Sequence, residues 1–235
     1  MFSLFRPKTA SFDKIGIRTD WHCHLLPKVD DGVQDLGRTI RILDDMRRAG
    51  YRTVVHTPHF NPELFPANTE DSIRDAFERY RDNVPRTLDM QLAGEYMVYD
   101  GFEKRDMSQL LQIEPGKVLI EMSYLYPSAT MEQSIFSIRM AGLTPVIAHP
   151  ERYLYYADTL DRFDRLHELG AQFQLNLLSL QGSYGPKSIQ ILEYILDKGW
   201  YSYLGTDTHS VHHFRGIAQN PFKAKYLLQL QAIAR

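Results

Sequence analysis

The sequence predicts a single α/β domain in which parallel strands alternate with helices and close into a seven-stranded, TIM-like barrel. Seven short apolar or alternating segments are each followed by helical sequence, and the polar residues cluster where those segments end. Buried parallel strands are almost continuously apolar, as residues 118–120 and 146–148 are. Because the polar strand ends would converge on one mouth, a closed barrel is favoured over an open sheet.

Strands are expected where short apolar or alternating runs lie between turn residues. The expected strands are residues 15–24, 53–57, 90–95, 117–122, 144–149, 172–177 and 202–206. In the sixth, Phe173 and Leu175 alternate with Gln174 and Asn176. The polar face of this strand therefore needs polar surroundings.

Helices are expected where apolar residues recur at helical spacing. The expected helices are residues 36–49, 69–83, 107–113, 131–141, 160–169, 188–197 and 220–233. The first places Ile42, Met46 and Ala49 on one face and ends at Gly50. We expect residues 1–17 to form a short leader and residues 18–235 to form one domain.

Composition excludes several classes of protein. Hydrophobic residues make up 43% and charged residues 24%, which is ordinary for a globular protein with a substantial core. A net charge of −2 lacks the excess of positive charge that is typical of proteins that bind nucleic acid or an anionic membrane. No apolar run approaches the ~20 residues of a membrane span, and the N-terminus lacks the core of a signal peptide. The single cysteine, Cys23, excludes an internal disulfide and fits the cytoplasm.

Side chains that commonly bind metals fall at or after the ends of most expected strands. His22 and His24 share one face of the first strand and form a chelating pair, although a lone H-x-H pair can arise by chance. The candidate ligands are His22, His24, Asp31, His59, Glu95, Glu121, His149, Asp207 and His209. So many donors from separate strands exceed what a polar rim needs, which favours a polynuclear metal site.

The types of donor indicate the chemistry. Imidazole and carboxylate without thiolate suit Mn²⁺, Fe or Zn²⁺. A carboxylate such as Glu95 can bridge two ions, and paired ions stabilise both oxygens of a phosphoryl displacement. Arg152, three residues after His149, has a guanidinium that matches phosphate, although a surface salt bridge is the alternative.

Other residues favour ordinary structural roles. Cys23 does not predict a thiol phosphatase, because the C-x5-R motif would need arginine where Val29 stands, and we expect Cys23 in the core. His56 lies within a strand and is expected to be packed or hydrogen-bonded. His212 and His213 are expected in a solvated loop.

Six motifs together carry a resemblance to a known family. They are Asp20-x-His22-x-His24-Leu25-Leu26-Pro27, Thr57-Pro58-His59, Gly94-Glu95-Tyr96, Leu119-Ile120-Glu121, Ala148-His149-Pro150-Glu151-Arg152 and Thr206-Asp207-x-His209. In this order they resemble the polymerase-and-histidinol-phosphatase (PHP) superfamily, and within it the bacterial metal-dependent tyrosine phosphatases of capsule and exopolysaccharide operons. The resemblance covers residues 20–209 and implies a distorted (β/α)7 barrel, in agreement with the strand count.

The resemblance also implies three divalent metal ions, with Mn²⁺ first among the candidates. By the family pattern the ligand sets are His22, His24, Glu95 and Asp207; Glu95, Glu121 and His149; and Asp31, His59 and His209. The chain departs from the pattern at Lys28 and Ser210, where members usually carry glycine and asparagine. The expected catalytic residues are Arg152 and, approximately in register, Arg215.

The resulting hypothesis is a cytoplasmic, metal-dependent protein-tyrosine phosphatase, a phosphoric monoester hydrolase. By resemblance its substrate would be the tyrosine-rich tail of a bacterial tyrosine autokinase that controls capsule or exopolysaccharide synthesis. Tyr124 and Tyr126 could stack on a substrate ring. The alternatives are the same fold acting on another phosphoester, such as histidinol phosphate, or a non-catalytic metal-binding module, and the sequence leaves oligomerisation open.

Overall fold

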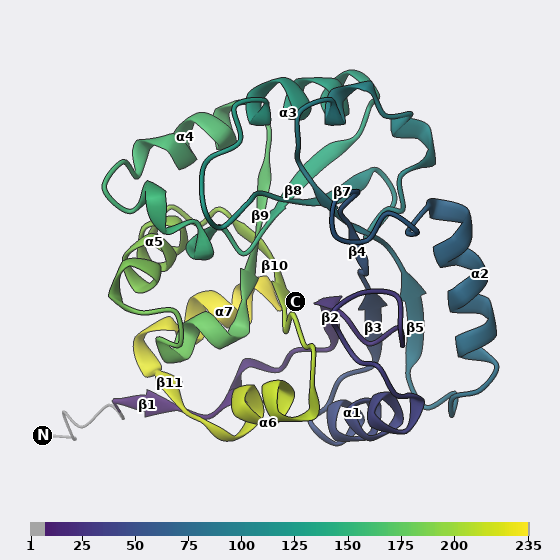
Figure 1. Cartoon of the computed structure of the whole chain (residues 1–235). Helices are drawn as coiled ribbons and strands as arrows, with labels where there is room; N and C mark the ends of the chain where they lie inside the picture. Colours follow the sequence, from purple (N-terminus) through teal and green to yellow (C-terminus); the bar gives the residue numbers. More distant parts are fainter. Residues whose placement is uncertain (1–7, 235) are drawn as a thin grey trace, which may run out of the picture.

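A computed structural model describes residues 8–234, and its strands surround a common centre with the helices outside (Figure 1). Two parallel sheets line this centre, one with the order β10-β9-β8-β7-β6-β4 and one with the order β2-β3-β5. The sheets meet between β2 and β10, where the Asp207 N–H donates to the His22 carbonyl at 2.7 Å and the His24 N–H to the Thr208 carbonyl at 3.0 Å. This is the distorted barrel that the sequence predicts.

The strands are short, as buried strands of a barrel usually are. They are β1 (Thr9–Ala10), β2 (Thr19–Cys23), β3 (Thr53–His56), β4 (His59–Phe60), β5 (Asp89–Leu92), β6 (Glu95–Met97), β7 (Lys117–Glu121), β8 (Thr144–Ala148), β9 (Gln172–Asn176), β10 (Tyr201–Gly205) and β11 (Phe222–Lys223). The strand predicted over residues 90–95 is divided in two. Its first part, β5, pairs with β3, and β6 pairs with β4 and β7, so the chain crosses between the sheets here.

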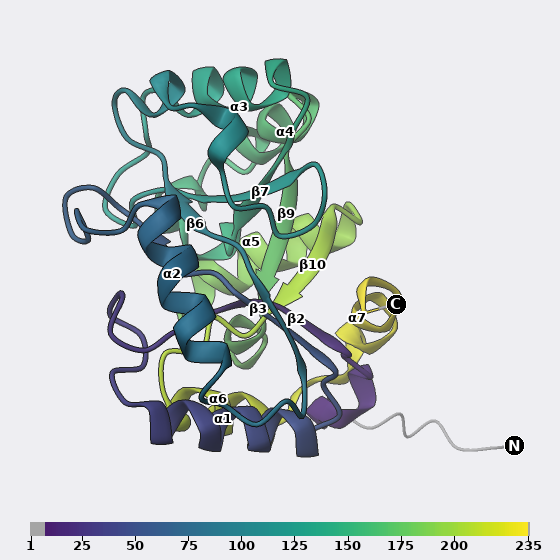
Figure 2. The same ribbon diagram turned by 90° about the vertical axis from the view of Figure 1, so that its right-hand side faces the viewer.

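The helices cover the outer faces of the sheets (Figure 2). They are α1 (Leu36–Arg48), α2 (Glu70–Arg81), α3 (Met131–Met140), α4 (Asp161–Glu168), α5 (Pro186–Asp197), α6 (Val211–Gln219) and α7 (Leu227–Ile233). The helix predicted over residues 107–113 is only a 3-10 turn, Met107–Gln109. Its continuation is prevented because the Leu111 N–H donates to the Tyr96 hydroxyl and the Ile113 N–H to the Lys117 carbonyl.

The C-terminal region also differs from the prediction. The helix predicted over residues 220–233 begins only at α7, since Phe222–Lys223 pairs with β1 as strand β11. The loop predicted around His212 and His213 is helix α6, whose N-terminus is capped by the Ser210 side chain. No described helix is both long and apolar enough to cross a membrane.

Part of the predicted leader, residues 1–7, lies outside the described residues. The described part packs on the barrel: β1 pairs with β11, and Phe12, Ile15 and Ile17 are buried in the main core.

Buried apolar side chains form two separate clusters. The larger one lies between the sheets and the helices and includes Val54, Val118 and Ile147. The smaller, which we call the inner apolar layer, consists of Val55, Ala93, Ile113, Leu119, Val146, Ala148 and Tyr203. Because neighbouring strand residues face opposite sides, this layer lies inside the barrel.

Candidate metal centre

The nine predicted ligand residues come together at the carboxyl ends of the strands. In four groups of these side chains, one donor atom from each residue lies within 4.8 Å of those of the others. The groups are His24, Asp31, His59 and His209; His22, His24 and Glu95; His22, His149 and Asp207; and His59, Glu95 and Glu121. Most of these side chains are buried, and Asp31, His59 and His209 lie nearer the solvent.

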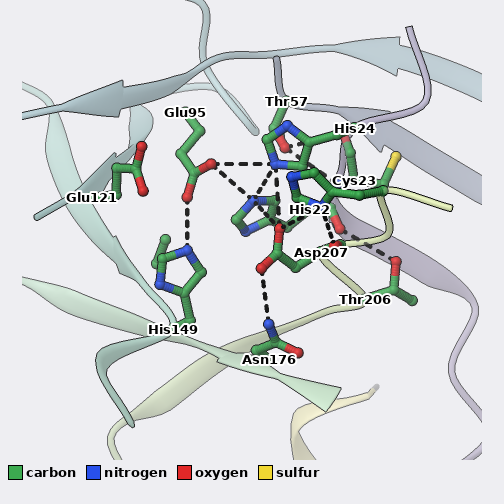
Figure 3. A network of polar contacts seen from close by, with 12 residues as sticks. His22, Cys23, His24, Thr57, Glu95, Glu121, His149, Asn176, Thr206 and Asp207 are labelled. Atoms are coloured by element: carbon green, nitrogen blue, oxygen red, sulfur yellow. Dashed lines mark hydrogen bonds and ion pairs between the residues drawn. The ribbon is translucent and has the colours of Figure 1, made fainter. Parts of the chain in front are cut away.

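Glu95 lies at the centre of the cluster (Figure 3). Its Oε2 atom lies 3.2 Å from His22 Nε2, 3.3 Å from His24 Nε2 and 3.1 Å from His59 Nδ1. Its Oε1 atom lies 2.9 Å from His149 Nε2. A carboxylate with imidazoles at both oxygens is placed to bridge two cations.

The observed groups overlap with the ligand sets that the resemblance implies but do not reproduce them. Asp207 Oδ1 lies 3.4 Å from His22 Nε2 and 3.3 Å from His24 Nε2, as the first set requires. His59, which the pattern assigns to the third set, lies with Nδ1 only 3.0 Å from Glu121 Oε1. The division of the nine donors among individual ions therefore stays a prediction.

Both histidines of the H-x-H motif point into the barrel, because residues two apart share a face of the strand. The pairing of β2 with β3 shifts register between Asp20 and Cys23. Cys23 points away from its histidine neighbours and is fully buried in the main core, as predicted. Nearby, Gly205 is required because a Cβ there would lie 2.5 Å from the Cβ of His22.

Two of the candidate ligands adopt a left-handed backbone conformation. The φ angle is 36° at His149 and 52° at Asp207, values that non-glycine residues seldom take. Ala148 already faces the inner apolar layer, so plain alternation would point His149 outward. The left-handed turn brings its imidazole back to the cluster, and such strain typically marks functional sites.

Neighbouring polar side chains orient the histidines. Gln174 Oε1 lies 2.9 Å from His22 Nδ1, and Asp30 Oδ2 lies 2.9 Å from His24 Nδ1. Both acceptors select the tautomer with a proton on Nδ1, which leaves Nε2 free to bind a metal. Asp30 and Gln174 were not predicted as site residues, although the polar face of the sixth predicted strand was a signal for Gln174.

The charges in the cluster keep the Glu95 carboxylate ionised. Burial raises the pKa of Glu95, but His22 and His59 outweigh this effect and keep that pKa well below its ordinary value. Burial lowers the pKa of His59, but Glu121 and Glu95 raise it to about 9. The cluster therefore needs compensating positive charge, which protonated imidazoles or bound cations can supply.

The donors fit a group of divalent ions. His59 Nδ1, Glu95 Oε2 and His149 Nδ1 are buried without a hydrogen-bond partner among the described residues. Leaving such atoms without a hydrogen bond is costly in a protein interior, and two of them, His59 Nδ1 and Glu95 Oε2, lie 3.1 Å apart within the cluster. Nitrogen and oxygen donors without sulfur suit Mn²⁺, Fe or Zn²⁺.

Arg152 lies beside the cluster, as predicted, and is held on three sides. Its Nη1 donates to Asp207 Oδ2 at 2.8 Å, and Asn176 Nδ2 donates to the same oxygen at 2.9 Å. The guanidinium carbon lies 4.1 Å from the ring centre of Tyr124 and 4.8 Å from that of Tyr184. Neither Tyr184 nor Asn176 was predicted as a site residue.

Arg215, the second predicted catalytic arginine, is not at the site. It lies on α6 and is about half exposed, and its Nε donates to Asp45 Oδ2 on α1 at 3.1 Å. The prediction relied on the spacing of Arg215 from the Asp207-x-His209 motif. It did not include helix α6, which directs this side chain outward. His213, on the same helix, lies with its ring parallel to that of His209, at a centroid distance of 6.1 Å.

The two departures from the family pattern fit their local backbones. Lys28 has a φ angle of 64°, a conformation that favours the glycine usual at this position. Ser210 accepts a hydrogen bond from the His213 N–H at 3.1 Å and caps α6, a role that asparagine fills equally well.

Comparison with known proteins identifies the family to which the chain is similar. Residues 18–218 match the profile of the family described as capsular polysaccharide synthesis, CpsB/CapC. The tyrosine-protein phosphatase YwqE of Bacillus subtilis is 28% identical over 200 residues, which cover 82% of this chain and 77% of that protein. CpsB of Streptococcus agalactiae is 26% identical over 202 residues, which cover 82% and 83% of the two chains.

A solved structure shows the same fold. Crystal structures are known of YwqE from Bacillus subtilis and CpsB from Streptococcus pneumoniae, which are described as unique metal-dependent tyrosine phosphatases. One chain of these structures aligns with the present chain with a TM-score of 0.74. The alignment covers 91% of this chain and 90% of that one at 26% identity. Together with the profile match over residues 18–218, these findings identify the chain as a member of the CpsB/CapC family of capsular polysaccharide synthesis proteins.

Proposed function

We propose that the protein is a metal-dependent protein-tyrosine phosphatase. The observation that carries this proposal is the cluster of buried imidazole and carboxylate donors with the Arg152 guanidinium beside it. The names of the relatives YwqE and CpsB, both tyrosine-protein phosphatases, point to the same activity.

The nine clustered donors would hold three divalent ions, with Mn²⁺ preferred and Fe or Zn²⁺ as alternatives. When bound, such ions supply positive charge to the phosphoryl oxygens and activate a water molecule as the nucleophile. Gln174 and Asp30 keep His22 and His24 in the tautomer that the ions require. The carboxylate of Glu95, which contacts four imidazoles, would be a ligand shared by neighbouring ions.

Arg152 would stabilise the charge that develops on the phosphoryl group. Its contacts with Asp207, Tyr124 and Tyr184 hold the guanidinium in place before a substrate arrives. Only Nη1 has an acceptor among the described residues, so other N–H groups can donate to phosphate. Donors fixed in advance stabilise a transition state most effectively, because they need no reorganisation during the reaction.

Tyr124 adds a hydroxyl at the same place. Its Oη lies 3.3 Å from His149 Nε2 and 3.4 Å from Glu121 Oε2, so the group faces the cluster. The leaving phenolate of phosphotyrosine has a conjugate pKa of about 10 and needs less help from an acid than an alkoxide does. A hydrogen bond from Tyr124 would suffice to assist it.

The biological substrate that we propose is the tyrosine-rich tail of a bacterial tyrosine autokinase in the cytoplasm. The family description connects the chain with capsular polysaccharide synthesis, which dephosphorylation of such a kinase would control.

Metal analysis combined with a substrate panel tests the proposed activity. We expect more than one transition-metal ion per chain and a strong preference for a phosphotyrosyl peptide over a phosphoseryl peptide and histidinol phosphate. Chelators should abolish the activity, whereas alkylation of Cys23 should not. A preference for histidinol phosphate would indicate a small-molecule phosphatase, and a metal-loaded protein inactive on every phosphoester would indicate a binding module.

Arginine variants test the mechanism. Arg152→Ala should lower kcat/KM by roughly 10²–10³-fold with unchanged metal content, because one preorganised donor is lost. Arg152→Lys should recover little, since an ammonium cannot replace the planar fork. Arg215→Ala is the matched control and should retain nearly full activity, because Arg215 pairs with Asp45 on the outer surface. Equal losses in Arg152→Ala and Arg215→Ala would contradict this assignment.

A further inference from the structure

A large pocket extends from the metal centre over the surface of the barrel. Its volume is about 750 Å³, within the range of roughly 300–1,000 Å³ that is typical of sites for drug-sized ligands. His59, Arg152, Asp207 and His209 lie at its inner end, so the pocket is continuous with the metal centre. A pocket of this size has room for much more than a phosphate group.

Three connections form the outer walls of the pocket. They are residues 61–65 after β4, residues 97–100 at and after the end of β6, and residues 123–129 after β7. Figure 2 shows the first of these, the connection that leads into α2, projecting from the barrel. All three follow the carboxyl ends of their strands, where barrel enzymes carry their substrate contacts.

The outer walls of this pocket carry an unusual concentration of exposed apolar side chains. Nine large apolar side chains are exposed in the part of the chain that the structure describes, and four of them line this pocket. Leu64, Leu125 and Tyr126 belong to the outer walls, and Leu125 is 85% exposed. The fourth, Tyr124, reaches from the wall to Arg152 at the inner end. Isolated exposed apolar residues are normal, but a group of them beside a functional site marks a surface for binding.

The ionised groups on the outer walls have one sign. Glu63 and Asp100 line the pocket and are exposed, whereas Arg152 is the only lysine or arginine among the residues lining it, and it lies at the inner end. The outer part of the pocket therefore repels acidic side chains and accepts neutral ones.

We infer that this pocket binds the polypeptide on both sides of the phosphotyrosine, with large apolar side chains of the substrate against Leu64, Leu125 and Tyr126. Acidic side chains at these positions are disfavoured by Glu63 and Asp100. The inference rests on the proposed function and narrows its substrate to phosphotyrosines with apolar neighbours. A small phosphoester would reach the metal centre but leave the apolar walls uncovered.

Three phosphotyrosyl peptides that differ only beside the phosphotyrosine test this inference. Their flanking residues are leucine, glycine or glutamate. For the metal-loaded wild type we expect kcat/KM to be roughly tenfold higher with leucine than with glycine, and lower again with glutamate. The same order should appear in the Kd values of peptides that carry a non-hydrolysable phosphonate, measured by calorimetry.

Variants of the walls localise the effect. In Leu125→Ser/Tyr126→Ser the ratio of kcat/KM between the leucine and glycine peptides should fall from about ten to about one. Glu63→Gln/Asp100→Asn should weaken the discrimination against glutamate. Phe136→Ser is the matched control, because Phe136 is an exposed aromatic residue on α3 outside the pocket, and its ratios should equal those of the wild type.

The outcomes separate this inference from the proposed function. Equal values for the leucine and glycine peptides, or wall variants that keep the wild-type ratio, would overturn the inference even in an active phosphatase. Binding that prefers leucine flanks in a protein that hydrolyses none of the peptides would support the surface and overturn the proposed activity.

Discussion

The barrel interior has two layers that share some of their strands but differ in polarity and charge. In β7, Leu119 belongs to the inner apolar layer, and Glu121, two residues later, belongs to the metal centre. Likewise, Tyr203 in β10 belongs to the inner apolar layer, and Asp207, just after β10, belongs to the metal centre. Because residues two apart share a face of a strand, one strand can contribute to both layers, as β7 does.

The difference shows how the barrel separates stability from chemistry. The inner apolar layer consists of buried aliphatic side chains and one tyrosine, which stabilise the fold by leaving water. The metal centre above it contains buried carboxylates and unpaired donor atoms, which cost stability unless cations are bound. Substitutions in the two layers should therefore have opposite signatures.

The largest effect is expected from Glu95→Gln, which removes a charge from the centre of the upper layer. Since Glu95 contacts four imidazoles, we expect metal content to fall and kcat/KM to drop by more than roughly 10³-fold. Elemental analysis and steady-state kinetics measure both. Glu132→Gln, at an exposed ion pair with Arg165, is the control. Full metal content in active Glu95→Gln protein would remove Glu95 from the ligand set.

Leu119→Ala should have the opposite signature. The cavity left in the inner apolar layer should lower the free energy of unfolding by about 2–5 kcal/mol, while the folded protein keeps its metal. Urea denaturation and metal analysis of the folded fraction measure the two quantities. Leu228→Ala, at a largely exposed position, should change stability by less than about 0.5 kcal/mol. Loss of metal from folded Leu119→Ala would mean that the layers are coupled.

A smaller effect is expected at the residues that orient the ligands. Gln174→Leu removes the acceptor for His22 Nδ1 and should weaken metal affinity by roughly 10–100-fold. Titration against a competing chelator measures this affinity. Gln172→Leu, two residues earlier in β9, provides a control of the same chemistry. Similar affinities in the two variants would show that the tautomer of His22 does not depend on Gln174.

The smallest effect concerns His56, a histidine outside both layers. It faces α2, next to Phe77 and Tyr80, and burial lowers its pKa to about 3 from 6.5. Below pH 6.5 the unfolded chain therefore binds a proton that the folded chain does not, and the wild type loses stability as the pH falls.

The His56→Gln variant lacks this proton uptake. Its free energy of unfolding relative to that of the wild type should therefore rise by up to about 1.4 kcal/mol for each pH unit below the ordinary histidine pKa. Urea denaturation of both proteins between about pH 7 and pH 5 measures the difference, and contributions of the other histidines cancel. A difference independent of pH would mean that His56 titrates normally in the folded protein.

The sequence by itself determined the barrel and the nine clustered donors. Strand periodicity decides which side chains share a face, so alternation alone assigns His22 and His24 to one side of the strand and Cys23 to the other. Parallel βα units place every strand end at one edge, which brings His59, Glu121 and Asp207 together although they are far apart in the chain. Both rules are local or topological, and the folded protein obeys them at these residues.

The tertiary structure alone decided where individual side chains lie when their neighbours come from distant segments. Arg215 follows the site motif in the sequence but is carried outward by α6 to Asp45, because helix geometry determines its direction. Gln174 and Asp30 become partners of the histidines only through the register of the strands and the path of one loop. The left-handed turn at His149 breaks the alternation of its strand, and only contacts made by the whole barrel can hold a conformation that the local chain disfavours.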